Sequence, residues 1–215
     1  MIHTLPEPHS TSTRRRRRKD ARPAEIIDAG FQVFAEKGFH GTRLDEVAAR
    51  AGIVKGTIYR YYDSKEALFE AAVRARIAPM LEQAGALVEN YAGSSAELLR
   101  EVFKALYGKI AENELQVVMR IIIAEGDRFP AIREFYYRES ITRLQALFAA
   151  VVGRGVERGE FRPGPATDQP MIVAAPAIMA MVWQLTFQAY SPIELDRFVE
   201  AHLDLILNGL NRQSA

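Results

Sequence analysis

The sequence of 215 residues contains no cysteine, which excludes disulfides, thiolate metal sites and a cysteine nucleophile. It also lacks a long apolar run. The longest one, Met171–Trp183, is interrupted by Pro176 and is too short to span a bilayer. The first residues show no apolar segment of the kind that a secretory signal needs. We therefore expect a soluble, cytoplasmic protein with no membrane association.

The charge of the chain is small in total but uneven in its distribution. Residues 1–22 hold seven basic and two acidic side chains, a net charge of +5, so the remaining residues carry −4 of the total of +1. A basic end on a mildly acidic body is typical of a nucleic-acid-binding arm. The basic run consists of Arg14, Arg15, Arg16, Arg17, Arg18 and Lys19.

Beyond Arg22 almost every segment has helical hydrophobic spacing, and no alternating strand pattern is present. The sequence predicts an all-α fold, with an N-terminal three-helix helix-turn-helix domain over residues 21–68 and a helical-bundle regulatory and dimerisation domain over residues 69–215. Residues 1–20 are rich in Pro, Ser, Thr and Arg, which predicts disorder. Besides a short helix after Thr42, the predicted helices span residues 22–37, 54–61, 65–91 with a kink or break at Pro79, 95–111, 114–125, 130–158, 168–190 and 193–210.

The segment from Gly38 to Phe69 has the layout of a helix-turn-helix. Pro23 suits the first turn of the preceding helix, and Gly38 ends that helix in a left-handed conformation. Thr42 offers an N-cap to a short second helix, which Gly52 closes. Two short helices joined at a glycine and braced by a longer helix are typical of this motif.

The third helix, predicted over residues 54–61, presents one polar face. When Ile58 points inward, helical geometry also places Val54 and Tyr62 on the inward side. The residues left outward are short, polar, basic or aromatic, which suits a groove lined by phosphates and base edges. Gly56 would let the backbone come close to DNA.

The string from Thr57-Ile58-Tyr59 through Ser64-Lys65-Glu66 is highly characteristic, and residues 23–69 resemble the DNA-binding domain of the TetR family. The resemblance implies a C-terminal helical bundle with a ligand cavity, and a dimer formed through the last two helices, here residues 168–190 and 193–210. The residues that it places at base edges are Lys55, Gly56, Thr57 and Tyr59. Those that it places against phosphates are Thr42, Arg43, Arg60, Tyr61 and Lys65.

The basic run at residues 14–19 has three interpretations. It could follow the DNA backbone or enter the minor groove, or it could be a solvated tail that aids solubility. Its position directly before a DNA-binding unit favours the DNA arm. A role at a membrane surface is the weakest of the three, because the tail has no apolar face.

Residues of the second domain either line a ligand cavity or pack in the core. Arg120 lies in a segment that is apolar nearly all round, where a structural ion pair is favoured over a contact with an anionic ligand. We expect most aromatic and methionine side chains in the core or the dimer interface, and some at a cavity. The candidate ligand contacts are Phe103, Tyr107, Met119, Arg120, Ile123, Tyr136, Met179 and Trp183.

The sequence contains no pattern typical of a catalytic or metal-binding site. Among the four histidines only His40 and His202 lie outside the N-terminal tail, and neither neighbours a metal-ligand or triad pattern. The sequence also has no glycine loop of the kind that cradles phosphates. We expect no metal, no cofactor and no enzyme activity.

Together these observations predict a ligand-responsive transcriptional regulator, with a repressor favoured, that binds a palindromic DNA operator as a homodimer and responds to a small, largely apolar effector. A corepressor scheme is thermodynamically equivalent. Two other classes stay open: a non-specific DNA-packaging protein acting through its basic arm, and an enzyme or carrier that keeps the helix-turn-helix as a relic. The intact outward face over residues 55–60 argues against both.

Overall fold

The computed structural model describes the backbone of residues 11–211 and the side chains of residues 22–211. Within this range the chain is helical, and its only extended pairing is an isolated bridge between Phe161 and Asn211. The predicted all-α class is confirmed. The chain divides into two compact units, Met1–Ala72 and Val73–Ala215, whereas the sequence had placed the boundary after residue 68.

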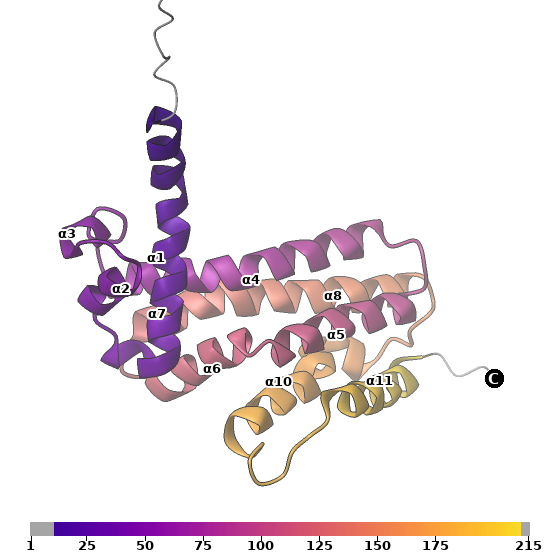
Figure 1. The fold of residues 1–215 in the computed structure, drawn as a ribbon. Helices are drawn as coiled ribbons and strands as arrows, with labels where there is room; N and C mark the ends of the chain where they lie inside the picture. Colours follow the sequence, from indigo (N-terminus) through magenta and orange to yellow (C-terminus); the bar gives the residue numbers. More distant parts are fainter. Residues whose placement is uncertain (1–10, 212–215) are drawn as a thin grey trace, which may run out of the picture. The chain divides into compact units, whose positions relative to one another are not determined.

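The first unit is built around three aromatic rings. The centroid of Phe34 lies 5.9 Å from that of Phe39 and 5.2 Å from that of Phe69, and the Phe39 and Phe69 centroids are 5.4 Å apart. All three side chains are buried, so they hold the helices of this unit together. These helices are α1 (Thr11–Gly41), α2 (Leu44–Arg50), α3 (Lys55–Ile58) and the first residues of α4 (Lys65–Asn90), as Figure 1 shows.

Helix α1 begins earlier than the sequence predicted. Disorder was expected through residue 20, but the backbone is helical from Thr11, and Pro23 lies inside the helix instead of in its first turn. No Gly or Pro falls between residues 11 and 22, and Arg, Lys and Ala favour helix, which accounts for the extension. Residues 1–10 of the expected arm lie outside the described residues.

The turn from α1 to α2 differs from the prediction in its capping. Gly38 has φ 71° and ψ −178°, so a residue with a Cβ would be strained there. Thr42 does not cap α2, because its hydroxyl donates to the carbonyl of Gly38 at 2.7 Å, and Arg43 takes the N-cap position without a side-chain bond. The hydroxyl therefore closes the turn behind α1 and leaves the start of α2 uncapped.

The second unit is a bundle in which α5 packs against α8 and α11, and α10 packs against α8 and α11 (Figure 1). Its core includes Phe103, Phe148 and Leu203. The helices predicted over residues 95–111 and 114–125 are confirmed without change. The helices after α4 are α5 (Ser95–Ala111), α6 (Glu114–Glu125), α7 (Pro130–Tyr136), the π-helical turn η1 (Tyr137–Ile141), α8 (Thr142–Glu157), α9 (Pro165–Asp168), α10 (Met171–Thr186) and α11 (Leu195–Leu210).

Two helices differ from the prediction: α4 has no break at Pro79, and the helix expected over residues 130–158 is not continuous. Pro79 does not break α4, which continues to Asn90, and the side chain of Pro79 is exposed. The helix expected over residues 130–158 is interrupted by η1, whose bond from the N–H of Thr142 to the carbonyl of Tyr137 spans five residues. A π turn adds a residue to the helix without changing its hydrophobic residue types, so sequence periodicity alone does not reveal it.

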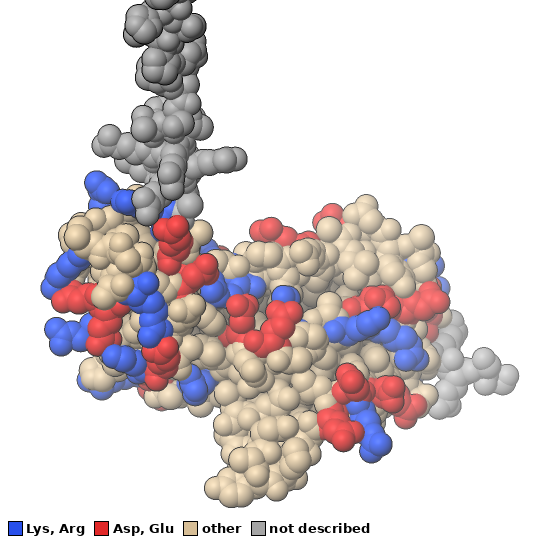
Figure 2. Space-filling view, viewed as in Figure 1, with Lys and Arg blue, Asp and Glu red and all other residues tan. Residues whose placement is uncertain are grey.

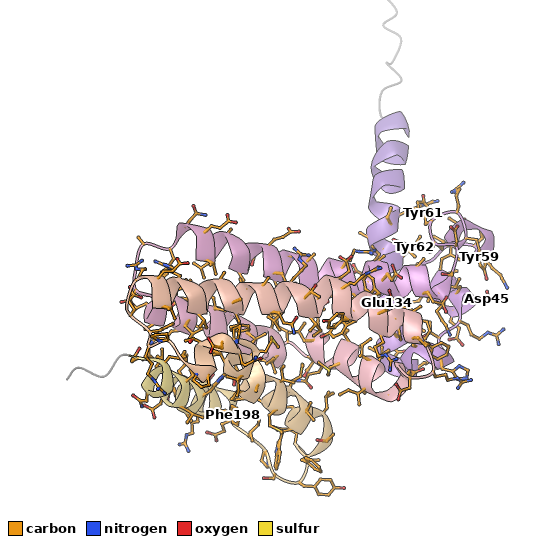
Figure 3. The ribbon with its side chains drawn as sticks, turned by 180° about the vertical axis from the view of Figure 1, so that it is seen from behind. Asp45, Tyr59, Tyr61, Tyr62, Glu134 and Phe198 are labelled. Carbon is orange, nitrogen blue, oxygen red and sulfur yellow. The ribbon has the colours of Figure 1, made fainter. Side chains whose placement is uncertain are left out.

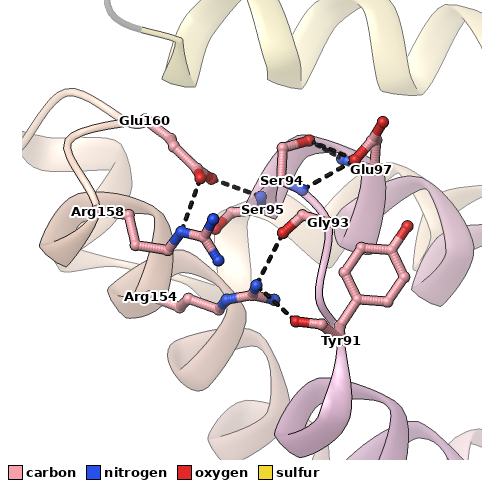
Figure 4. Close-up of polar contacts among 8 residues, drawn as sticks. All are labelled: Tyr91, Gly93, Ser94, Ser95, Glu97, Arg154, Arg158 and Glu160. Atoms are coloured by element: carbon pink, nitrogen blue, oxygen red, sulfur yellow. Dashed lines mark hydrogen bonds and ion pairs between the residues drawn. The ribbon is translucent and has the colours of Figure 1, made fainter.

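A polar cluster fixes the start of α5 to the end of α8 (Figure 4). Ser94 and Glu97 form a reciprocal capping box at the N-terminus of α5. Glu160 accepts a hydrogen bond of 2.5 Å from the N–H of Ser95, and Arg154 donates to the carbonyls of Tyr91 and Gly93, at 2.8 Å each. The cluster therefore satisfies the backbone groups of the loop that precedes α5.

Candidate functional site

The turn between α2 and α3 has the geometry of a helix-turn-helix. Gly52 has φ 65°, and its N–H donates to the carbonyl of Ala49 at 3.2 Å. The N–H of Ile53 donates to the carbonyl of Ala48 at 2.9 Å. This pair of bonds ends α2 in a Schellman motif and directs the chain into α3.

Helix α3 is shorter than the segment predicted over residues 54–61. Ile58 is fully buried, which confirms its inward position. Val54 is 73% exposed, so its predicted inward position is wrong. The reason is that Val54 precedes the helix with an extended backbone, where helical periodicity does not apply. Tyr62 is partly inward, and this burial raises the pKa of its hydroxyl.

The opposite face of α3 and the turn after it is exposed. Lys55, Gly56, Tyr59 and Arg60 are exposed, and Thr57 is half-buried. An added Cβ at Gly56 would meet no atom within 4 Å, so the backbone is open at this point. Figure 3 shows Tyr59 on the same side of the unit as Asp45. Of the four residues that the TetR resemblance places at base edges, Lys55, Gly56 and Tyr59 are therefore accessible, and Thr57 is partly so.

Acidic partners hold some of the basic side chains of this unit. The ammonium of Lys55 lies 2.8 Å from a carboxylate oxygen of Asp45, and this hydrogen bond raises the pKa of Lys55. Arg50 donates to both carboxylate oxygens of Glu36, at 2.6 and 2.7 Å. Sequence reasoning missed both acidic partners, because they come from other helices at separations that no local pattern marks.

The residues predicted to contact phosphates occupy different environments. Arg43 and Arg60 are exposed, and the Arg60 guanidinium lies 5.7 Å from the centroid of the half-buried Tyr61 ring. Lys65 donates to the carbonyl of His40 at 3.1 Å. Thr42 is only 3% exposed, so its position does not support a phosphate contact through its hydroxyl.

The basic run at residues 14–19 lies in the N-terminal part of α1. The backbone of residues 14–19 is part of α1, and their side chains lie outside the described residues. Where side chains are described, Figure 2 shows basic and acidic groups intermixed over the surface of the first unit. The contact of this run with DNA stays a prediction.

The second unit contains an apolar cavity of about 60 Å³. Its walls come from α4, α5, α6, the end of α7, η1, α8 and α10. The lining residues are Ile77, Met80, Leu81, Leu106, Ile110, Leu115, Met119, Tyr136, Ser140, Ile141, Leu144, Ala174, Ala177, Ile178 and Met181. Among these residues only Tyr136 and Ser140 carry a polar side-chain atom other than sulfur, and none carries a charge at neutral pH, since burial raises the pKa of Tyr136 to about 12.

The structure places two of the predicted ligand residues, Met119 and Tyr136, in the cavity wall. Phe103 and Tyr107 are buried beside His202 in the core and do not line the cavity. The others lie away from the lining: Arg120 is exposed, Ile123 is 62% and Met179 57% exposed, and the indole N–H of Trp183 donates to the carbonyl of Ser191 at 2.7 Å.

Most of the predicted ligand residues lie outside this cavity for a physical reason. The prediction gave preference to aromatic side chains, whereas aliphatic and methionine side chains form most of the wall. The inward positions of α10 held a usable signal, because Ala174, Ala177, Ile178 and Met181 recur at helical spacing. Ser140 lies at helical spacing from Tyr136 and Leu144, but a serine is not a residue type that an apolar pattern selects.

Comparisons with known proteins decide the family. The model described as "Bacterial regulatory proteins, tetR family" matches residues 26–72. The model described as "Tetracyclin repressor-like, C-terminal domain" matches residues 91–202, more than half of the chain. The chain belongs to the TetR family. This confirms the resemblance and identifies the protein as a helix-turn-helix transcriptional regulator.

Several other transcriptional regulators match nearly the full chain. The HTH-type transcriptional repressor KstR2 of Mycobacterium tuberculosis is 24% identical over 90% of this chain and 95% of its own. A putative transcriptional regulator from Saccharomonospora viridis, solved in complex with choline, is 19% identical, with a TM-score of 0.74 over 91% of this chain and 100% of that chain. FadR from Bacillus subtilis, solved in complex with stearoyl-CoA, is 20% identical, with a TM-score of 0.71 over 86% of this chain and 98% of that chain.

Membrane-spanning helices and metal-binding clusters are both absent from the described part of the chain, residues 11–211. None of the helices described there has the length and apolar character needed to cross a membrane. The same residues contain no group of three or more His, Cys, Asp or Glu side chains that could hold a metal ion.

Proposed function

We propose that this TetR-family regulator is a repressor that binds a palindromic operator as a homodimer and leaves it when a small molecule occupies the apolar cavity. The exposed surface formed by Lys55, Gly56 and Tyr59 carries the proposal. It lies opposite the buried Ile58, so it is free to enter a major groove while the core of the unit stays intact.

The paired charges of the first unit agree with a DNA-binding role. Lys55 is 62% exposed although it is paired with Asp45, and an exposed pair of this kind is weak. A phosphate can therefore replace the carboxylate at little cost. Arg43 and Arg60 add exposed positive charge, and the basic run at residues 14–19 supplies further charge from the same helix as the core of the unit.

Dimer formation through α10 and α11 has support from their exposed surface. No charged residue occurs from Gln169 to Ile193, and over α10 and the loop that follows it Figure 2 shows an uncharged surface. Ile172 is 60%, Met179 57% and Leu205 67% exposed. A groove between the two helices is lined almost entirely by apolar atoms. Such a surface favours association with a second copy.

Small-molecule control has support from the cavity and from relatives. The cavity lies among six helices of the second unit and is open to an apolar occupant. One structural neighbour was solved with stearoyl-CoA and another with choline. An effector that favours one arrangement of the dimer would change its affinity for an operator that needs fixed half-site spacing.

A fluorescence-anisotropy titration tests the proposal. The purified full chain is titrated against DNA from beside its own gene, with excess random duplex as competitor. Tyr59→Ala should weaken specific binding by about 1–3 kcal/mol, because it removes a contact at the base edges. Tyr137→Ala is the matched control: its side chain is 53% exposed, against 45% for Tyr59, and it belongs to the second unit.

Several outcomes would contradict the proposal. If Tyr59→Ala binds specific and random duplexes with the same affinities as the wild type, the surface around α3 does not recognise the operator. Binding that survives Tyr59→Ala but is lost when residues 1–19 are deleted would favour the DNA-packaging alternative. Turnover of a bound compound without selective DNA binding would favour the enzyme alternative.

A further inference from the structure

We infer that the cavity accepts an uncharged, mostly apolar molecule whose single oxygen, a carbonyl or hydroxyl, accepts a hydrogen bond from Ser140. This inference rests on the proposed function and adds the chemical class of the effector to it. Its basis is a buried hydroxyl without a partner, in a wall whose only other polar side-chain group, sulfur aside, is the Tyr136 hydroxyl.

Ser140 is 5% exposed, and its hydroxyl has no hydrogen-bond partner among the described residues. A serine or threonine inside a helix ordinarily donates to the carbonyl four residues back. Thr142, two residues further along, does so: its hydroxyl donates to the carbonyl of Arg138 at 2.5 Å. Unlike the hydroxyl of Thr142, the hydroxyl of Ser140 is therefore available to donate a hydrogen bond to a molecule in the cavity.

The backbone around Ser140 departs from an ordinary α-helix. Ser140 lies in η1, where the bond from the N–H of Thr142 to the carbonyl of Tyr137 replaces the α-helical pattern. The extra residue of a π turn shifts the register of the side chains around the helix, and such turns are frequent at functional sites. Tyr136 and Ser140 both line the cavity, with η1 between α7 and α8.

The lining excludes charged occupants. A carboxylate buried here would have no cationic partner, which is strongly unfavourable. A quaternary ammonium such as choline is recognised by several aromatic faces, but Tyr136 is the single aromatic ring among the lining residues. The group that enters this cavity is therefore neutral.

The size of the cavity adds a condition. Its volume of about 60 Å³ is smaller than the roughly 150 Å³ that accommodates benzene in an apolar protein cavity. A six-membered ring must therefore displace side chains. Met80, Met119 and Met181 line the cavity, and their unbranched side chains can change rotamer with little strain.

The test compares three probes with the same ring: cyclohexanone, methylcyclohexane and cyclohexyltrimethylammonium. Binding to the full chain is measured by ligand-observed NMR. Ser140→Ala should weaken cyclohexanone about three- to tenfold and leave methylcyclohexane unchanged, because only the ketone accepts the hydrogen bond. Ser95→Ala is the matched control, since Ser95 is also fully buried in the second unit but lies outside the cavity lining. It should bind both probes as the wild type does.

Equal affinity of wild type and Ser140→Ala for cyclohexanone would overturn the inference, as would tightest binding of the ammonium probe. Either result leaves the cavity as a ligand site, so the proposed function stands. Failure of all three probes to bind would also overturn the inference. The operator titration of the same protein then tests the proposed function by itself, because operator binding without an effector does not require an occupied cavity.

Discussion

His202 is a buried histidine whose two ring nitrogens are both bonded. Its Nε2 lies 2.8 Å from the carbonyl oxygen of Val173, and its Nδ1 lies 3.0 Å from the hydroxyl of Tyr107. Because a carbonyl only accepts, Nε2 carries the proton and Nδ1 accepts from Tyr107. A second proton on Nδ1 would reverse that bond, so that the Tyr107 hydroxyl would have to accept from Nδ1. The neutral ring thereby links α5, α10 and α11.

Burial lowers the pKa of His202 below its ordinary value of 6.5. The unfolded chain then binds a proton more readily than the folded chain, so the stability that this group contributes is complete above pH 6.5 and is lost as the pH falls below it. We expect the free energy of unfolding to decrease by at most about 1.4 kcal/mol per pH unit below 6.5 because of this one residue. Urea unfolding at a series of pH values between 5 and 8 measures it.

His202→Phe should flatten this part of the pH dependence, and His40→Gln is its control because His40 is exposed. If the pH dependence of the free energy of unfolding persists in His202→Phe and disappears in His40→Gln, His202 is not its source.

Gly155 lies where α8 touches the loop after it. A Cβ at this position would lie 2.1 Å from the ring of Phe161, which is 1% exposed and has no room to move. Gly155→Ala should therefore destabilise the protein by about 1–3 kcal/mol. Gly153→Ala is the control in the same helix, since its Cβ would meet nothing within 4 Å, and it should be neutral or slightly stabilising. Thermal unfolding of both variants measures the difference, and equal midpoints would contradict the packing argument.

At the scale of an element, the turn between α2 and α3 determines where the recognition surface points. Gly52 has φ 65°, which an L-residue adopts at a cost of roughly 1–2 kcal/mol. Gly52→Ala should lower the free energy of unfolding by about that amount and weaken DNA binding with it. Gly56→Ala should leave stability nearly unchanged, because its Cβ would meet no atom within 4 Å. Denaturant unfolding measures the change in the free energy of unfolding, and the operator titration measures the change in DNA affinity.

The elements also show what sequence patterns predict well. The helices at residues 95–111 and 114–125 were predicted without error, because residues that favour turns, Gly93, Asn113 and Gly126, flank them. Periodicity predicted the inward position of Ile58 correctly. It failed for Val54, because Val54 precedes α3 and its backbone is extended. The π turn at η1 had no local signal, whereas the helix propensity of Arg, Lys and Ala in residues 11–22 was a signal for the extension of α1.

The candidate sites divide in the same way. The surface around α3 was predictable because contiguous residues form it and a family pattern marks them. The cavity was not, because residues from six helices form it and only tertiary packing decides which of them face inward. Phe103 and Tyr107 illustrate this, since they share the residue types expected at a cavity but pack in the core.

At the scale of the whole molecule, the exposed apolar surface of α10 and α11 predicts the oligomeric state. Leu205→Glu would place a charge on this surface and should shift the protein from dimer toward monomer in analytical ultracentrifugation. Ile123→Glu is the matched control, since Ile123 is 62% exposed on α6. A monomeric wild type, or equal dissociation of both variants, would contradict a dimer formed through α10 and α11.

The uncharged stretch from Gln169 to Ile193 has a consequence for gene dosage. When only paired protomers bind the operator, the amount of active repressor at low abundance follows the square of the protein concentration. A twofold fall in the protein concentration then leaves about a quarter of the dimer. The target genes would be derepressed sharply once growth dilutes the repressor faster than the cell synthesises it, even with no effector present.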